Sequence, residues 1–204
     1  MRRALFGGSF DPFHDGHLAM IRATLERGLA DLVMVMPAGH NPHKPAPAAS
    51  VEHRLRMAEL GVAGLAAVVV SDFEARRPGP SFTVETLESL AERHPGEVWR
   101  LLIGADNLED FLCWRQPERL LQLADLLVFP RGDAAVVLAA ELRPRATIVA
   151  GFACPAASTE VRATLAAGRC PTGLLPPTVR EYIERHGLYG CAPVGGSGEG
   201  ARCP

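Results

Sequence analysis

Runs of consecutive apolar residues, separated by loops that contain glycine or proline, recur along the first three quarters of the chain. They occupy residues 4–6, 31–37, 66–72, 98–104, 125–131 and 146–151. None shows the regular apolar and polar alternation of a half-exposed strand. Such runs are typical of strands in a parallel sheet that is covered on both faces. Six strands of one sheet are therefore expected.

Segments with helical spacing of apolar residues lie between these runs. The first covers residues 16–29, where Leu18, Ile21, Leu25 and Leu29 recur at intervals of three and four. Strand, loop and helix thus follow one another repeatedly, which favours an α/β fold with a doubly wound parallel sheet. Further helices are expected at residues 50–64 with Ser50 as N-cap, at 83–94 capped by Ser81 or Thr83, and at 105–114, 116–124, 158–168 and 176–189.

Length and composition fit one globular domain over residues 1–190, followed by a glycine-rich tail at 191–204 that is expected to be disordered. The net charge of −2 gives no reason to expect binding to nucleic acid or to anionic membranes. The sequence has no apolar run of the roughly 18 residues that a membrane span needs, so a cytoplasmic location is expected.

Five scattered cysteines without a Cys-x-x-Cys pair favour reduced thiols. The sequence does not decide whether the protein forms a homo-oligomer.

The segment GGSFDPFHDGH, residues 7–17, follows the first predicted strand and leads into the first predicted helix. Gly7 and Gly8 let a ligand approach the backbone closely, and His14 and His17 stand at the start of the helix. A helix N-terminus carries a positive partial charge and unpaired amides. This combination predicts an anion site with two imidazole donors, and phosphate is the expected anion.

Two further loops are expected at the same edge of the sheet. Lys44 is the only lysine among 21 basic residues, and it lies in a proline-rich loop after the second strand. A compact ammonium group suits a polyphosphate. Ser158 and Thr159 open a helix after the sixth strand, and Arg162 follows one turn later with a guanidinium that suits phosphate. A transition-metal site made by the two His-x-x-His pairs, His14 with His17 and His40 with His43, is the alternative.

GGSFDPFHDGH, together with NPHK, SFTVETL, GADNLEDFLCW and STEVR, resembles the bacterial nicotinate mononucleotide adenylyltransferases, within the nucleotidyltransferase superfamily that carries a His-x-Gly-His motif. The resemblance extends from the first strand to about Tyr189. It implies a Rossmann-like fold and the transfer of AMP from ATP to nicotinate mononucleotide, with Mg²⁺ on the phosphates and no metal ligands from protein side chains. Phe82, Glu85 and Ala157 depart from the usual tyrosine, aspartate and serine.

The resemblance also implies roles for individual residues. Catalytic roles fall to His14, His17, Lys44 and Arg162. ATP binding is assigned to Gly7, Gly8, Ser9, Phe10, His14, His17, Gly104, Asp106, Ser158, Thr159 and Arg162, and nicotinate nucleotide binding to Ser9, Lys44, Thr83, Trp114 and Arg115.

Three alternatives remain open at this point. The acceptor of the adenylyl group could be nicotinamide mononucleotide or phosphopantetheine, as in other adenylyltransferases of the superfamily. The protein could also bind nucleotides without catalysis. The full set of charged and imidazole side chains favours an enzyme, because a binding protein does not need groups that neutralise transition-state charge.

Overall fold

The computed structural model describes residues 1–41, 45–131, 136–152 and 156–191. Within these ranges the chain forms one six-stranded sheet in which every neighbouring pair of strands is parallel, in the order β3-β2-β1-β4-β5-β6. The predicted doubly wound α/β fold is confirmed. The strands are β1 (Arg2–Gly8), β2 (Leu32–Pro37), β3 (Val68–Val70), β4 (Val98–Gly104), β5 (Ala124–Phe129) and β6 (Ala146–Ile148).

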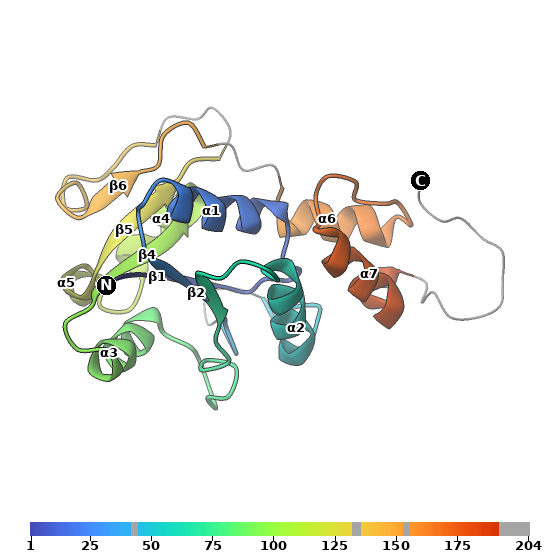
Figure 1. The fold of residues 1–204 in the computed structure, drawn as a ribbon, viewed down its shortest axis with the longest axis horizontal. Coiled ribbons are helices and arrows are strands. Elements are labelled where there is room, and N and C mark those ends of the chain that lie inside the picture. The colour runs from blue at the N-terminus through green and yellow to red at the C-terminus, as the bar shows by residue number, and fades with distance from the viewer. Residues whose placement is uncertain (42–44, 132–135, 153–155, 192–204) are drawn as a thin grey trace.

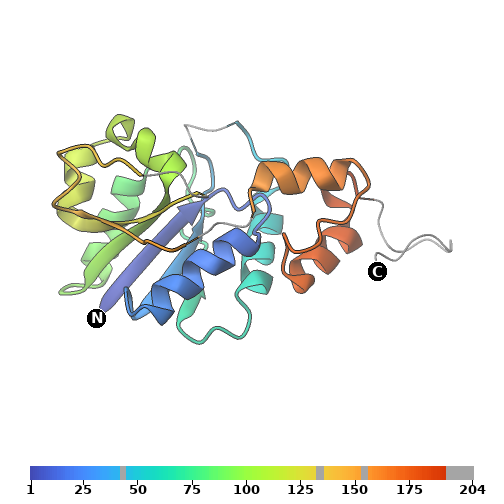
Figure 2. The same cartoon turned by 90° about the horizontal axis from the view of Figure 1, so that it is seen from above.

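Helices cover both faces of this sheet (Figure 1). They are α1 (Asp15–Glu26), α2 (Val51–Gly61), α3 (Thr83–Arg93), α4 (Ala105–Glu109), α5 (Pro117–Leu123), α6 (Ser158–Ala166) and α7 (Pro177–His186), with short 3-10 turns η1 (Phe111–Cys113) and η2 (Leu188–Gly190). Figure 2 shows α6 and α7 together at one end of the molecule. No helix among the described residues is long and apolar enough to cross a membrane.

The alternation of side chains along β1 divides the core into two layers. Ala4 and Phe6 pack on one face of the sheet with apolar residues of α1, α2, α6 and α7. Leu5 points to the opposite face and packs with residues of α3, α4 and α5. Because both faces are buried, successive residues of a central strand must all be apolar, which is why the strands appeared in the sequence as uninterrupted runs.

Several details of the predicted helices are wrong. The helix expected at 105–114 is divided into α4 and η1, and the one expected at 176–189 ends at His186. The N-cap of α3 is Phe82, without a capping hydrogen bond from any side chain, so neither Ser81 nor Thr83 caps it. Helix α1 ends at Glu26, and Leu29 lies beyond it because Gly28 adopts a left-handed conformation with φ of 62°. The predicted cap of α2 is confirmed, since the Ser50 hydroxyl accepts a hydrogen bond from the amide of His53 at 3.5 Å.

The single domain over 1–190 stays a prediction, and residues 192–204 of the predicted tail lie outside the described residues.

An aromatic cluster behind the motif loop fixes the start of α1. The rings of Phe6 and Phe10 meet edge to face with centroids 5.2 Å apart, and Phe10 lies 4.8 Å from the imidazole of His17. The neighbouring Phe13 is fully buried and its ring occupies the space where a Cβ atom of Gly61 would lie. The last residue of α2 therefore has to be a glycine for Phe13 to reach this position.

We expect Gly61→Ala to lower the free energy of unfolding by about 1–2 kcal/mol, because overpacking a buried ring costs more than alanine gains at a helix end. Urea denaturation measures the change. Gly7→Ala is the matched control, since a Cβ atom at Gly7 would meet nothing within 4 Å, and it is expected to leave stability unchanged or slightly higher. Wild-type stability of Gly61→Ala would contradict the fixed position of Phe13.

Candidate active site

Two adjoining cavities open at the carboxyl edge of the sheet, with volumes of about 530 Å³ and 340 Å³. They share five lining residues, so together they form one continuous cleft. In an open α/β sheet this edge is where ligands bind, at the point where the strand order reverses. The shared residues are Asn41, Ser81, Thr83, Asn107 and Trp114.

The structure brings together every site residue expected from the sequence that falls within the described ranges. The larger cavity is lined by Gly7, Gly8, Ser9, Phe10, His14, His17, Gly104, Asp106, Ser158, Thr159 and Arg162, the smaller one by Arg115, and both by Thr83 and Trp114. Lys44 and His43 lie outside the described residues. Their expected places in the site stay predictions.

His14 and His17 form a reciprocal cap at the start of α1. The amide of His17 donates to Nδ1 of His14 at 3.3 Å, and the amide of His14 donates to Nδ1 of His17 at 3.2 Å. The two rings stack with centroids 3.6 Å apart. Because each Nδ1 accepts a hydrogen bond, a neutral ring carries its proton on Nε2. The cap therefore fixes both imidazoles as Nε2–H donors beside the cleft.

Burial keeps the His14 ring neutral. Only 3% of the residue is exposed, and burial, reinforced by the positive charge of Arg131, lowers the pKa of His14 to about 4. At neutral pH this imidazole is a neutral hydrogen-bond donor rather than a cation. Positive charge for a phosphate must then come from arginine side chains or from lysine.

The start of α6 supplies such a charge. Arg162 donates from Nη1 to the backbone carbonyl of Asp11 at 2.7 Å, and from Nη2 to the Thr159 hydroxyl at 3.5 Å. The Ser158 hydroxyl donates to the carbonyl of Pro12 at 3.3 Å. Ala157 is the N-cap of this helix, and no side chain caps it. Hydroxyls, amides and a guanidinium thus meet next to the motif loop, which suits a phosphate group.

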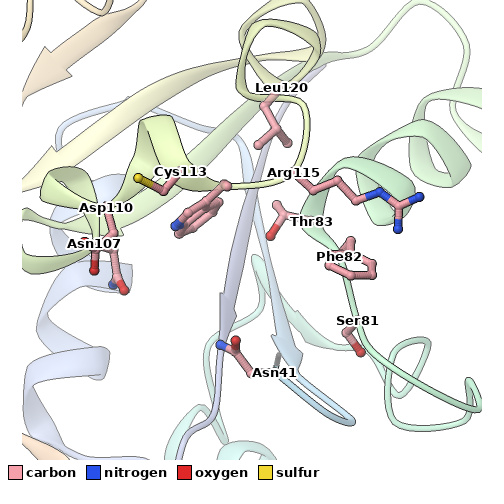
Figure 3. Close-up of a pocket in the computed structure, with 10 residues that line it drawn as sticks. Asn41, Ser81, Phe82, Thr83, Asn107, Asp110, Cys113, Arg115 and Leu120 are labelled. Atoms are coloured by element: carbon pink, nitrogen blue, oxygen red, sulfur yellow. The ribbon is translucent and has the colours of Figure 1, made fainter. Parts of the chain in front are cut away.

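The smaller cavity lies at the start of α3. Figure 3 shows Ser81, Phe82 and Thr83 on one side of it, and Asn107 and Asp110 on the other. The first amides of a helix have no partner within the helix, and α3 has no side-chain cap. These amides are suited to bind a carboxylate or another small anion.

Arg115 extends past this cavity toward α3 (Figure 3). Its guanidinium pairs with the carboxylate of Glu85 at 3.0 Å and lies 4.5 Å from the centroid of the Phe82 ring. Glu85 also pairs with Arg77 at 3.1 Å. The charge of Arg115 is therefore already shared with a carboxylate, and its side chain lies along α3.

Several residues of the cleft were missed by the sequence analysis. Arg131 follows β5 and pairs with Asp106 at 3.2 Å. The rule that ligands gather after parallel strands could have found it, because it comes two residues after a strand end. Asn41 and Asn107 also line both cavities. Asn41 belongs to the motif NPHK and Asn107 to GADNLEDFLCW, but the sequence analysis assigned neither asparagine a role.

A buried arginine binds the backbone of the loops that line the cleft. Arg54 of α2 is 2% exposed and donates to the backbone carbonyl oxygens of Ser9 at 2.7 Å, Ala49 at 3.3 Å and Gly39 at 3.4 Å. It thereby joins the motif loop to both ends of the proline-rich segment that contains Lys44. In the sequence Arg54 looked like any polar residue of an amphipathic helix, so nothing indicated this role.

The fold and the site define a nucleotidyltransferase. Residues 5–164 match the family model described as cytidylyltransferase-like. Among solved structures, the nicotinic acid mononucleotide adenylyltransferase of Plasmodium falciparum complexed with NaAD is similar in fold, with a TM-score of 0.77 at 18% identity over 92% of this chain and 97% of that chain.

Relatives with higher sequence identity show which family of nucleotidyltransferases the chain resembles. The protein named nicotinate-nucleotide adenylyltransferase from Synechococcus sp. (strain JA-3-3Ab) is 43% identical, over 92% of this chain and 94% of its own length. The one from Bordetella petrii is 42% identical, over 92% and 98%. The chain belongs to the nicotinate-nucleotide adenylyltransferase family, and the resemblance inferred from the sequence is confirmed.

The lowered pKa of His14 has a consequence for stability. In the unfolded chain this histidine has its ordinary pKa of 6.5 and binds a proton below that pH, whereas in the folded protein its pKa of about 4 keeps it neutral down to about pH 4. The stability that neutral His14 contributes is therefore present above pH 6.5 and is lost as the pH falls toward 4. We expect the free energy of unfolding to fall by about 2 kcal/mol between pH 7 and pH 5 on account of His14.

Urea denaturation at the two pH values measures this effect. His14→Asn is the comparison, because asparagine keeps a side-chain acceptor at the N-cap but does not titrate. The variant is expected to lose about 2 kcal/mol less than the wild type between pH 7 and pH 5. The same loss in both proteins would show that His14 is not the group that titrates.

Proposed function

We propose that this protein transfers the AMP moiety of ATP to nicotinate mononucleotide, releasing pyrophosphate and forming deamido-NAD. The observation that carries the proposal is the pair of Nε2–H imidazole donors at the start of α1, in a cleft that continues into a smaller cavity at the uncapped start of α3. The larger part suits a polyphosphate, and the smaller part suits an anionic ring.

The reaction is an exchange between phosphate oxygens. An oxygen of the mononucleotide's phosphate attacks the α-phosphorus of ATP, a new P–O bond forms, and the bond to the bridging oxygen of the β-phosphate breaks as pyrophosphate leaves. The nucleophile is already ionised at neutral pH, so the protein does not have to supply a base. Catalysis then consists of alignment and of stabilising the charge that develops.

Each group of side chains has one task in this proposal. His14 and His17 donate to the oxygens of the α-phosphate, where negative charge builds up in the transition state. Ser158, Thr159 and Arg162 hold the outgoing pyrophosphate, together with Lys44. Gly104 and Asp106 contact the ribose of the nucleotide. Gly7, Gly8, Ser9 and Phe10 let the backbone approach the phosphates.

Magnesium is proposed to enter with ATP and to neutralise charge on its phosphates. Mg²⁺ typically keeps several waters and is held by substrate phosphates with few protein ligands. Among the residues that the structure describes, no group of three or more His, Cys, Asp or Glu side chains could hold a metal ion. The donors that do line the cleft, imidazoles, hydroxyls and guanidinium groups, suit phosphate oxygens rather than the metal itself.

The acceptor's ring is proposed to lie in the smaller cavity, between Thr83 and Trp114. The amides at the start of α3 are donors without a competing acceptor, so they favour the carboxylate of nicotinate over the amide of nicotinamide. Arg115 would add positive charge nearby, but it is the weaker of the two contributors because Glu85 already neutralises it.

We expect His17→Ala to lower turnover by about 10²-fold or more, as loss of a donor aimed at transition-state charge typically does. The measurement is pyrophosphate release from ATP with nicotinate mononucleotide as acceptor. His94→Ala is the control, because His94 caps the C-terminus of α3 and does not line either cavity, and it should keep wild-type turnover. Near wild-type turnover in His17→Ala would rule out the proposed mechanism.

We expect kcat/KM to be at least about 10-fold higher with nicotinate mononucleotide than with nicotinamide mononucleotide, equivalent to about 1.4 kcal/mol. Arg115→Ala should keep most of this preference if the amides of α3 supply it. The assay runs both mononucleotides, and phosphopantetheine, side by side at saturating ATP. Equal efficiency with the two mononucleotides would contradict recognition of the carboxylate, and use of phosphopantetheine alone would favour the other adenylyltransferase type.

A further inference from the structure

The carboxylate of Asp11 joins segments that are far apart in the sequence. It is 5% exposed and accepts hydrogen bonds from the amides of Ala48 at 2.8 Å and Ala49 at 3.0 Å. A third hydrogen bond comes from the hydroxyl of Tyr189 at 2.7 Å, across 178 positions of sequence. Its backbone carbonyl is the acceptor for Arg162. One residue of the motif loop thus contacts the proline-rich segment, α6 and η2.

Tyr189 reaches Asp11 through an unfavourable backbone conformation. It lies in η2 with φ of 58° and ψ of 27°, a left-handed geometry that residues with a side chain rarely adopt. Such a conformation persists only where the surrounding contacts hold it, and it marks a position worth examining for function. Here one such contact is the hydrogen bond from the Tyr189 hydroxyl to the Asp11 carboxylate, and the Tyr189 residue also packs against the hydrophobic core.

The phenol is suited to be a permanent donor. Burial, together with the hydrogen bond to Asp11, raises the pKa of Tyr189 above its usual value. The hydroxyl therefore keeps its proton at any pH at which the protein works. Tyr189 itself lines neither cavity, whereas Asp11 lines the larger one. Any effect of Tyr189 on the cleft must be transmitted by Asp11.

We propose that Tyr189 is a positioning residue for the polyphosphate part of the cleft: by holding the Asp11 carboxylate, it fixes the motif loop, the proline-rich segment and Arg162 relative to one another. The proposal rests on the proposed function, because it assumes that these three segments bind the phosphates of ATP. It assigns the C-terminal η2 turn a part in ATP binding although no residue of that turn lies in the cleft.

The test is Tyr189→Phe, which removes one oxygen atom and keeps the ring. We expect the KM for ATP to rise about tenfold, since hydrogen bonds to a charged group are among the stronger ones, while the KM for nicotinate mononucleotide changes less than twofold. Titration calorimetry with a non-hydrolysable ATP analogue should show the same fold-change in Kd. Asp11→Asn, which weakens the acceptor of the same hydrogen bond, should change the KM for ATP in the same direction.

Tyr182→Phe is the matched control. The Tyr182 hydroxyl lies 2.9 Å from Nδ1 of His53, so it joins α7 to α2 by a similar bond in the same part of the chain. Both variants are expected to lower Tm, and each is assayed 15 °C below its own Tm. A purely structural role predicts that the KM for ATP stays within twofold of wild type in both variants. That result would overturn the proposal.

The outcomes also separate this inference from the proposed function. If the wild type releases pyrophosphate but Tyr189→Phe binds ATP as tightly as Tyr182→Phe, only the positioning role fails. If the wild type releases no pyrophosphate with any acceptor, the proposed function fails, and the calorimetric comparison still tests the positioning role. If Tyr189→Phe does not fold, Asp11→Asn decides, and an unchanged affinity for the ATP analogue in that variant contradicts the proposal.

Discussion

The reversal of strand order between β1 and β4 is the constraint on which the rest of the structure depends. β1 pairs with β2 on one side and with β4 on the other, so the chain leaves β1 and β4 in opposite directions, toward helices on opposite faces of the sheet. Because the connections run to opposite faces, the cleft at the carboxyl edge stays open between β1 and β4. The motif loop, the start of α4 and the starts of α3 and α6 all border it. The N-termini of α3 and α6 have no side-chain cap, and their positive partial charge makes the cleft attractive to anions without a large net charge on the protein.

Within the cleft, two kinds of hydrogen-bond donor, imidazoles and guanidinium groups, have different physical tasks. The imidazoles of His14 and His17 are directional: the reciprocal cap sets their tautomer, and burial keeps His14 neutral. Arginine supplies positive charge instead, through Arg162 and Arg131, and each shares its charge with a carboxylate: Arg162 lies 3.9 Å from that of Asp11 and Arg131 lies 3.2 Å from that of Asp106. A neutral donor held in place costs little to keep in a buried position, whereas an unpaired buried cation would be expensive. The cleft thus combines fixed hydrogen bonds with cations that lie nearer to solvent.

Buried polar groups join the loops of the site to one another, in addition to the apolar packing of Phe10 and Phe13 in the motif loop. Arg54 and Asp11 act as a complementary pair, with the guanidinium satisfying carbonyl oxygens of the loops and the carboxylate satisfying their amides. A buried carboxylate of Glu74 accepts a hydrogen bond from the Thr86 hydroxyl at 2.7 Å and ties the loop after β3 to the first turns of α3. These buried hydrogen bonds add to the apolar packing and connect loops that are far apart in the sequence.

The sequence by itself determined the strands of the sheet, the order of helices and strands along the chain, the family, and which loops carry the residues proposed to bind phosphate. Apolar runs, glycines and motifs are local, so they need no partner to be recognised. It could not determine how those loops are held. Asp11, Arg54 and Tyr189 are ordinary polar or aromatic residues until the fold brings positions 11, 49 and 189 together. The same holds for the start of α3, where Ser81 and Thr83 looked like caps but Phe82 is the N-cap. It also holds for Arg115, because the direction of its side chain depends on the carboxylate of Glu85 in α3. Contacts between distant segments depend on distances that only the folded chain sets, and these contacts decided the geometry of the site.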